Sequence, residues 1–304
     1  MLSWQNYAIM MPGLMAANAV IDQAIVKQPF GVNRYNLIFR TGFLYLIPAC
    51  VLIVIAHSSY PRISWEDTAL LISMGAFWTL ALLPYFKGLQ ESNAGVVTAL
   101  FNTIPLMTFG IAWIFLGEHI NLRQAGAAVL ILFAATAIGF NPKTIRFNYV
   151  AMAYIVTACL MYSVYVVLLR YVAHKFSAPA IVGWIMMGAF LTTLAIISCA
   201  PQRRVQFLEA CKTSPKMLLA LFFIQLIIGT FTHLVTIKSL QVGPGAGIVN
   251  TIWNLQPAFA FFYLILAGRL LPAFYRRICL DRAFVWHLSC LILMFVGLLL
   301  LLHS

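Results

Sequence analysis

The feature that most constrains this chain is the apolar run from Ala94 to Glu118, AGVVTALFNTIPLMTFGIAWIFLGE. It is long enough to cross a lipid bilayer as a helix, which takes about 20 apolar residues. Pro105 lies in its middle, where proline would kink or break a soluble helix. Asn102 lies three residues earlier and therefore on the same helical face. The run predicts a membrane span with polar groups near its centre.

The same pattern returns in the second half of the chain, as AGIVNTIWNLQP from Ala246 to Pro257. At an offset of 152 residues, Ala94 aligns with Ala246 and Pro105 aligns with Pro257. Ala, Gly, Val, Asn and Pro recur in register between the two copies. Self-similarity of this kind indicates two related units within one chain.

The composition fits only a protein that lies in lipid. Of the 304 residues, 63% are hydrophobic and 9% are charged, whereas about 25% are charged in a typical soluble domain. The net charge of +12 comes from basic residues that stand mostly between the apolar runs. In that position they suit the flanks of membrane spans and lipid phosphates, so we expect no nucleic-acid partner.

The apolar runs predict ten membrane spans. They cover residues 7–26, 37–56, 68–86, 94–116, 122–140, 149–172, 180–199, 217–237, 245–267 and 284–302. Five spans per half is an odd number, so the second half enters the membrane upside down relative to the first. We therefore predict an all-α integral membrane protein with ten transmembrane helices in two inverted five-helix repeats, residues 1–141 and 142–304.

Residues 94–140 resemble the EamA-type branch of the drug/metabolite transporter superfamily. The resemblance is carried by the Ala-Gly start, Pro105 in mid-helix, the Leu-Gly-Glu118 close and the Gln124-Ala-Gly entry to the next span. Arg40 resembles the arginine that this family carries in its second helix. The resemblance implies a metabolite transporter that works by alternating access, without an ATPase domain and with both termini in the cytoplasm.

The distribution of charge favours the opposite orientation. With ten spans, most of the 19 Lys and Arg residues fall on the side of the membrane away from the termini. Because basic loops stay in the cytoplasm, this count places both termini outside. The orientation is open between the two arguments.

Polar and aromatic side chains near the span centres are the candidates for substrate binding. Asn102 and Asn254 are the repeat-related pair, and they either form hydrogen bonds between helices or face each other across a central cavity. The remaining candidates would line that cavity or serve as packing and interface residues: Trp78, Tyr85, Tyr162, Tyr165, Trp253 and His233.

Three charged residues are candidates for ion coupling or for structural support: Asp22, Arg40 and Glu118. Glu118 ends its span, where it would pair with a basic residue and hold the spans of residues 94–116 and 122–140 together, or would couple transport to protons. In the second repeat, Ala267-Gly268-Arg269 stands in place of Leu-Gly-Glu.

The function favoured by these features is a secondary transporter of small organic metabolites, such as amino acids or related solutes, in a bacterial inner membrane. The alternative is a transporter-like subunit or a receptor without transport activity. An intramembrane enzyme is disfavoured because the sequence has no HExxH motif and no paired intramembrane aspartates. We expect no cofactor and no metal site, a small-molecule substrate and membrane lipids as partners, and a monomer or weak homodimer.

The ten-span arrangement predicts that both ends of the chain lie on the same side of the membrane. Cysteines introduced at Ser3 and Ser304 should therefore react with an impermeant thiol reagent from the same side. Labelling from opposite sides would mean an odd number of spans and would contradict the inverted repeat.

Overall fold

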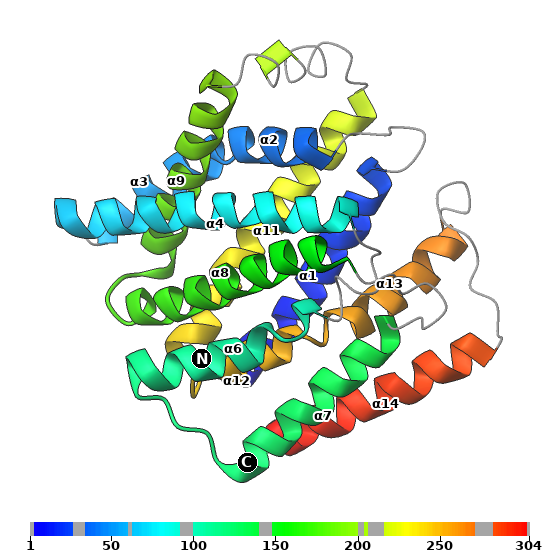
Figure 1. The fold of residues 1–304 in the computed structure, drawn as a ribbon. Coiled ribbons are helices and arrows are strands. Elements are labelled where there is room, and N and C mark those ends of the chain that lie inside the picture. Colours follow the sequence, from blue (N-terminus) through cyan, green and yellow to red (C-terminus); the bar gives the residue numbers. More distant parts are fainter. Residues whose placement is uncertain are drawn as a thin grey trace.

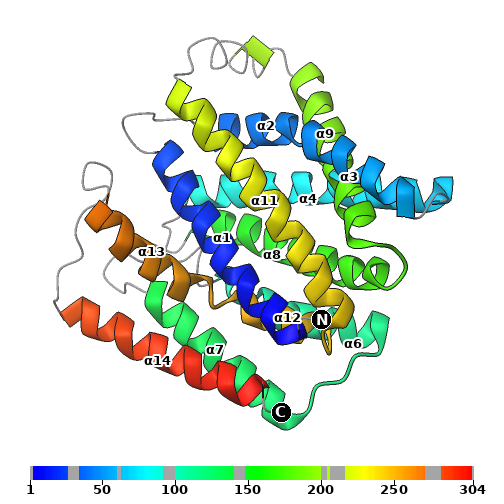
Figure 2. The same cartoon turned by 180° about the vertical axis from the view of Figure 1, so that it is seen from behind.

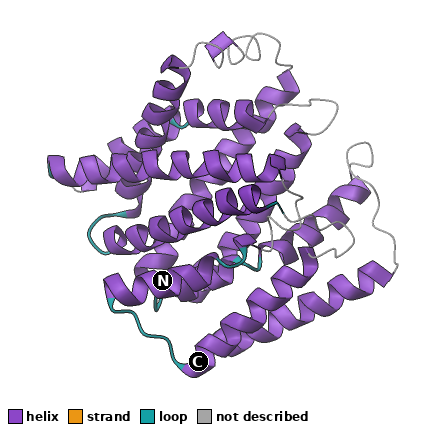
Figure 3. Ribbon diagram, viewed as in Figure 1, coloured by secondary structure: helices purple, strands orange, loops and turns teal. Residues whose placement is uncertain are grey.

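The computed structural model describes residues 3–26, 34–59, 63–91, 100–139, 148–199, 204–205, 216–270 and 282–302. The described chain is built of helices joined by short connections, and no strand occurs among these residues (Figure 3). The all-α prediction is confirmed for this part of the protein.

The helices follow the predicted spans closely in order and position. The first half contains α1 (Trp4–Val26), α2 (Arg34–Leu44), α3 (Leu46–Ser59), α4 (Trp65–Glu91), α6 (Ile104–Leu116) and α7 (Leu122–Gly139). The second half contains α8 (Tyr149–Ala173), α9 (Ala178–Cys199), α11 (Lys216–Val242), α12 (Ala246–Trp253), α13 (Gln256–Leu270) and α14 (Arg282–Leu302).

The prediction of one continuous helix over residues 94–116 is wrong in its centre. A turn at Asn102 and Thr103 separates the helical residues 100–101 from α6. Pro105 is the second residue of α6. Proline is tolerated in the first turn of a helix because its missing N–H has no partner there. The proline therefore begins a second helical segment instead of kinking a continuous one.

The predicted helix over residues 245–267 is interrupted in the same register. A turn at Asn254 and Leu255 separates α12 from α13, and Pro257 is the second residue of α13. Both copies of the repeat thus break at the asparagine and resume just before the proline. The sequence similarity between the copies extends to this local backbone geometry.

The predicted span over residues 37–56 also has an interruption, a turn at Tyr45 between α2 and α3. Pro48 lies three residues further on and cannot donate to the carbonyl of Leu44. The two segments still run on as one apolar stretch, Phe39–His57, that is long enough to cross a membrane.

The protein is an integral membrane protein by the length and hydropathy of its helices. In the described residues, five helical stretches are long and apolar enough to span a bilayer, and three shorter apolar helices accompany them. Large apolar side chains lie on the outer surface, for example Val54, Phe115 and Ile227, which are 70%, 75% and 68% exposed. Such a surface suits contact with lipid rather than water.

The helices form one bundle in which distant segments pack together (Figures 1 and 2). Helix α4 packs against α8 and α9, α1 packs against α11, and α7 pairs with α14. The start of α1 meets the end of α14, where Gln5 Nε2 donates to the carbonyl of Leu302 at 3.5 Å. The described ends of the chain therefore lie side by side. We call this the terminal side of the bundle.

Two glycines allow α4 and α9 to cross at very short distance. A Cβ atom on Gly75 would lie 2.0 Å from the carbonyl oxygen of Ile185, and one on Gly188 would lie 2.1 Å from the carbonyl oxygen of Ile72. The obstacles are backbone atoms, which cannot turn aside as a side chain can. Small residues of this kind let membrane helices approach closely.

Substitution of Gly75 by alanine should therefore lower stability. We expect a loss of about 1–3 kcal/mol, the usual range for overpacking, measured as a lower apparent melting temperature of the detergent-solubilised protein. Gly110→Ala is the matched control, because nothing lies within 4 Å of a Cβ at Gly110. Equal melting temperatures for the two variants would contradict the close crossing.

Candidate functional site

The break at Asn102 is stabilised by side chains from α8. Ser163 Oγ donates to the carbonyl of Ile104 at 3.1 Å, and Cys159 Sγ lies 3.5 Å from the carbonyl of Leu100. Inside a membrane, backbone groups that leave the helical pattern need such partners because no water replaces them. Helix α8 thus holds an irregular piece of backbone in the middle of the bundle.

Asn102 and Asn254 each bond to a partner close at hand. Asn102 is 7% exposed, and its Nδ2 donates to Thr136 Oγ1 on α7 at 3.3 Å. Asn254 is half-buried, and its Nδ2 donates to the carbonyl of Asn250 within its own half at 3.2 Å. These bonds satisfy one donor of each amide, and substrate binding between the two asparagines stays a prediction.

A third asparagine forms the buried link between the broken helices. Asn250 on α12 is 3% exposed, and its Nδ2 donates to Thr108 Oγ1 on α6 at 2.8 Å. Close by, a Cβ on Gly247 would lie 2.1 Å from Phe109 of α6. Helices α6 and α12 therefore meet along a tight seam, defined here by Thr108, Phe109, Gly247 and Asn250.

Aromatic side chains from both halves converge around Trp78 on α4. Its ring stacks on Tyr165 of α8, with centroids 6.4 Å apart, and meets His233 of α11 edge-on at 5.2 Å. Tyr45, from the turn between α2 and α3, lies at 5.9 Å. The structure thus brings together three of the predicted site residues, Trp78, Tyr165 and His233. We call these four side chains the aromatic cluster.

Two polar atoms in this region are buried without a hydrogen-bond partner among the described residues, Tyr165 Oη and Trp253 Nε1. Both residues belong to or pack against the same central core. An unsatisfied buried hydroxyl or indole N–H costs about 1–3 kcal/mol, so native proteins keep few of them. A bound solute with hydrogen-bonding groups could satisfy them.

The predicted residues Tyr85 and Tyr162 belong to a neighbouring group. Phe101, at the break before α6, lies between them, with ring centroids 4.7 Å from Tyr85 and 5.7 Å from Tyr162. These three rings connect α4, the break and α8. They form a second group of packed aromatic rings beside the break that contains Asn102.

Two of the three predicted charged candidates, Arg40 and Asp22, belong to α2 and α1. Arg40 on α2 is 7% exposed, and its guanidinium lies over the ring of Phe222 on α11 at 5.4 Å. This cation–π contact lets a charge remain in an apolar setting. Asp22 belongs to α1, and its side chain lies outside the described residues.

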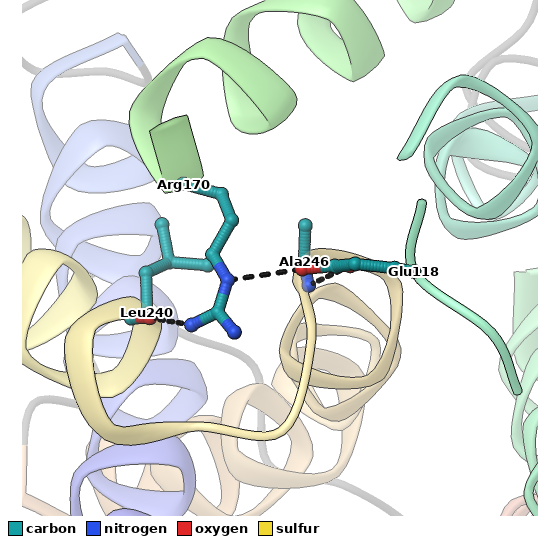
Figure 4. Close-up of polar contacts among 4 residues, drawn as sticks. All are labelled: Glu118, Arg170, Leu240 and Ala246. Carbon is teal, nitrogen blue, oxygen red and sulfur yellow. Dashed lines mark hydrogen bonds and ion pairs between the residues drawn. The ribbon is translucent and has the colours of Figure 1, made fainter. Parts of the chain in front are cut away.

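The third charged candidate, Glu118, joins four elements (Figure 4). Gly117 ends α6 with a left-handed φ of 65°, which glycine adopts without strain, and so directs Glu118 back toward the bundle. Glu118 Oε1 accepts from Arg170 Nε of α8 at 3.0 Å, and Oε2 accepts from the backbone N–H of Ala246 at 2.7 Å. Arg170 also donates to the carbonyl of Leu240 in the last turn of α11.

The prediction that Glu118 pairs with a basic residue is confirmed, but its expected place between the spans of residues 94–116 and 122–140 is wrong. The carboxylate meets α8 and the start of α12 instead, because the turn at Gly117 points it away from α7. This ion pair is the one found in the described part of the chain, and its side chains are 12% and 18% exposed. Glu118 also lines a pocket of about 310 Å³, together with Trp113 and His119.

Sequence reasoning missed Tyr45, Asn250 and Arg170. Pro48 was the available signal for the break at Tyr45, whereas Asn250 has no polar counterpart in register, because Thr98 occupies that position in the first copy. Arg170 lies in the last turn of α8, and no sequence motif marks it as the partner of Glu118. Its partner lies 52 residues away in the sequence, and only packing brings the two together. In the described residues no group of His, Cys, Asp and Glu could hold a metal ion.

Residues 8–140 match the EamA-like transporter family. The first half of this chain is therefore similar to the EamA-like transporters. An EamA-type unit identifies the protein as a membrane transporter rather than an enzyme.

Two further similarities agree with this assignment. A protein of Sinorhizobium sp., described as an uncharacterized transporter in the cobO 3' region, is 29% identical over 150 residues, which cover 43% of this chain and 98% of the relative. A solved crystal structure aligns with 98% of this chain and 95% of its own, at a TM-score of 0.67 and 15% identity. At that identity the second similarity shows the fold alone, and it extends over nearly the whole chain.

The contacts of Glu118 predict a strong energetic coupling with Arg170. Arg170→Met should destabilise the protein by roughly 3–5 kcal/mol, because it leaves a largely buried carboxylate without its counter-charge. The double variant Glu118→Gln/Arg170→Met should lose less than the sum of the two single losses. Thermal unfolding of the three variants in detergent would measure the coupling. Additive losses would show that the pair contributes nothing as a pair.

Proposed function

We propose that this protein is a secondary transporter that moves small organic metabolites, such as amino acids or related solutes, across a bacterial inner membrane by alternating access. Its substrate would lie near the middle of the membrane, between two inverted five-helix repeats. On this proposal the protein works as a monomer or weak homodimer surrounded by lipid.

The observation that carries the proposal is the aromatic cluster with its unpaired polar atom. Trp78 comes from the first half of the chain, and Tyr165 and His233 come from the second half. The hydroxyl of Tyr165 has no partner among the described residues. Aromatic faces with a few placed polar groups suit an amphipathic or aromatic solute.

The packing of the helices supports an inverted repeat. Helix α8 packs on α4 and α6, and the corresponding helix of the first half, α1, packs on α11 and α13. The breaks at Asn102 and Asn254 occupy the same register in the two copies. Repeats related in this way, with broken helices at the midplane, are the usual architecture of alternating-access transporters.

One packing difference between the halves supports two access states. Helix α4 crosses α9 closely at Gly75 and Gly188, whereas α11 makes few contacts with α2. In an alternating-access cycle, the tight interface (α4 with α9) would loosen while its counterpart in the other repeat (α11 with α2) tightens. The bacterial location rests on the similarity to the Sinorhizobium relative, and the amino acid substrates rest on the family resemblance and the aromatic lining.

Uptake into proteoliposomes tests the proposal directly. The purified protein would be reconstituted and supplied with radiolabelled amino acids of aromatic, aliphatic, acidic and basic side chains, with and without a pH gradient. We expect saturable accumulation or counterflow of at least one class, absent from protein-free vesicles. No flux of any solute by a folded, reconstituted protein would favour a receptor or a transporter-like subunit.

Tyr165→Phe separates binding from folding. Removing a buried hydroxyl without a partner should leave stability unchanged or raise it by about 1 kcal/mol, yet it should weaken substrate affinity if substrate uses that hydroxyl. Tyr45→Phe is the matched control, because Tyr45 lies in the same cluster but already takes part in other interactions within the protein. It should change substrate affinity less than Tyr165→Phe does. A Tyr165→Phe variant with normal affinity would remove this hydroxyl from the site.

Alanine at Asn102 or Asn254 tests the repeat-related pair. If substrate binds between the two amides, each variant should lose about 1–3 kcal/mol of binding free energy, the cost of leaving a polar group unpaired. Affinity from concentration-dependent uptake and stability from thermal unfolding should be compared. Normal transport by both variants would confine their role to the contacts with Thr136 and Asn250.

A further inference from the structure

The short helix α12 lies between two non-helical joints. Residues 243–245, Gly-Pro-Gly, connect it to α11, and the turn at Asn254 and Leu255 separates it from α13. A helix of eight residues between two such joints can move as a rigid unit, because the joints absorb the change in backbone angles. Figures 1 and 2 show its start beside the end of α6, on the side of the bundle where both chain ends lie.

Two charges hold α12 in place, and each meets a helix end of the opposite sign. The carboxylate of Glu118 accepts the first N–H of α12, at the positive end of the helix dipole. The guanidinium of Arg170 donates to Leu240, at the negative end of α11. The two charges also pair with each other. The contact therefore clamps both sides of the Gly-Pro-Gly connection.

The surroundings of the carboxylate leave little room for another arrangement. A Cβ on Gly245 would lie 2.9 Å from Glu118 Oε2, so the absence of a side chain there is what admits the carboxylate. Below it, Asn250 bonds to Thr108 and Gly247 fits against Phe109, which closes the seam between α6 and α12. Glu118 belongs to the first half of the chain, whereas the other residues of the clamp belong to the second.

We propose that α12 is the gate of the transporter on the terminal side and that Glu118 and Arg170 are its lock. The lock is closed in this structure. In the state open to the terminal side, the pair separates and α12 swings away from α6 about its two joints. Glu118 and Arg170 act through α12 and are positioning residues without substrate contact.

This inference rests on the proposed alternating access, but its test needs no substrate. Ala112 of α6 is 1% exposed and belongs to the core that contains Ala246 of α12, so a cysteine there should react only when the gate opens. Ala134 of α7 is 0% exposed and lies in a different core, where α7 packs chiefly on α14 and only slightly on α12, so separation of α12 from α6 should leave it covered. Ala112→Cys is the reporter and Ala134→Cys is its matched control.

The probe is a polyethylene glycol maleimide, added to the full-length protein in detergent, with each added cysteine scored as one extra gel shift over the natural cysteines. We expect Glu118→Gln and Arg170→Met each to speed labelling of the Ala112→Cys reporter about tenfold, the population change for loss of one charge-assisted hydrogen bond. Labelling of the Ala134→Cys control should stay slow. Lys87 of α4 donates to the Tyr154 hydroxyl of α8, away from the clamp. Lys87→Gln removes that bond and should change the labelling rate of neither the Ala112→Cys reporter nor the Ala134→Cys control.

Exchanging the two charges distinguishes the proposed lock from a simple ion pair, which would form again with the charges exchanged. Glu118→Arg/Arg170→Glu should leave the reporter fast, because arginine would then face the positive end of α12. Unchanged reporter labelling in the single variants, equal acceleration at Ala134→Cys, or full restoration by reversal would each overturn the lock. Uptake assays are scored separately, so a protein that transports nothing and still opens this way would refute the proposed function and not the gate.

Discussion

The structure depends on one constraint, that every backbone N–H and C=O inside lipid needs a partner. A continuous helix meets this requirement by itself, and a broken helix does not. Pro105 and Pro257 have no N–H to donate, and in both places the chain turns at the preceding asparagine, Asn102 or Asn254, and begins a new helix in which the proline is the second residue.

Side chains of a neighbouring helix add hydrogen bonds to the backbone at the first break. In the first copy, Ser163 and Cys159 of α8 reach the carbonyls of Ile104 and Leu100. The same helix carries Tyr165 into the aromatic cluster and Arg170 to Glu118. Helix α8 therefore contacts the irregular backbone, contributes to the aromatic cluster and supplies the basic partner of Glu118. A membrane transporter can place irregular backbone at its centre only where another element satisfies it.

The local features of the fold were accessible from sequence because they depend on neighbouring residues. Apolar length located the helices, and the recurrence of Asn and Pro located related positions in the two halves. The sequence also identified Trp78, Tyr165 and His233 as candidates. That these three side chains meet depends on the packing of α4, α8 and α11. The continuous helices predicted over residues 94–116 and 245–267 failed, since proline can either kink a helix or start a new one, and only the neighbouring side chains decide between these outcomes.

The sequence by itself determined that this chain lies in a membrane, that it is helical and that one motif recurs in its two halves. Hydropathy and repeat spacing are properties of the chain alone. Tertiary structure decided which partners the polar groups take. Glu118 meets Arg170 and Ala246, 52 and 128 residues away, and Asn250 meets Thr108 at a separation of 142 residues. No local pattern encodes such pairings, because they form only where close helix crossings, such as Gly247 on Phe109, bring the backbones together.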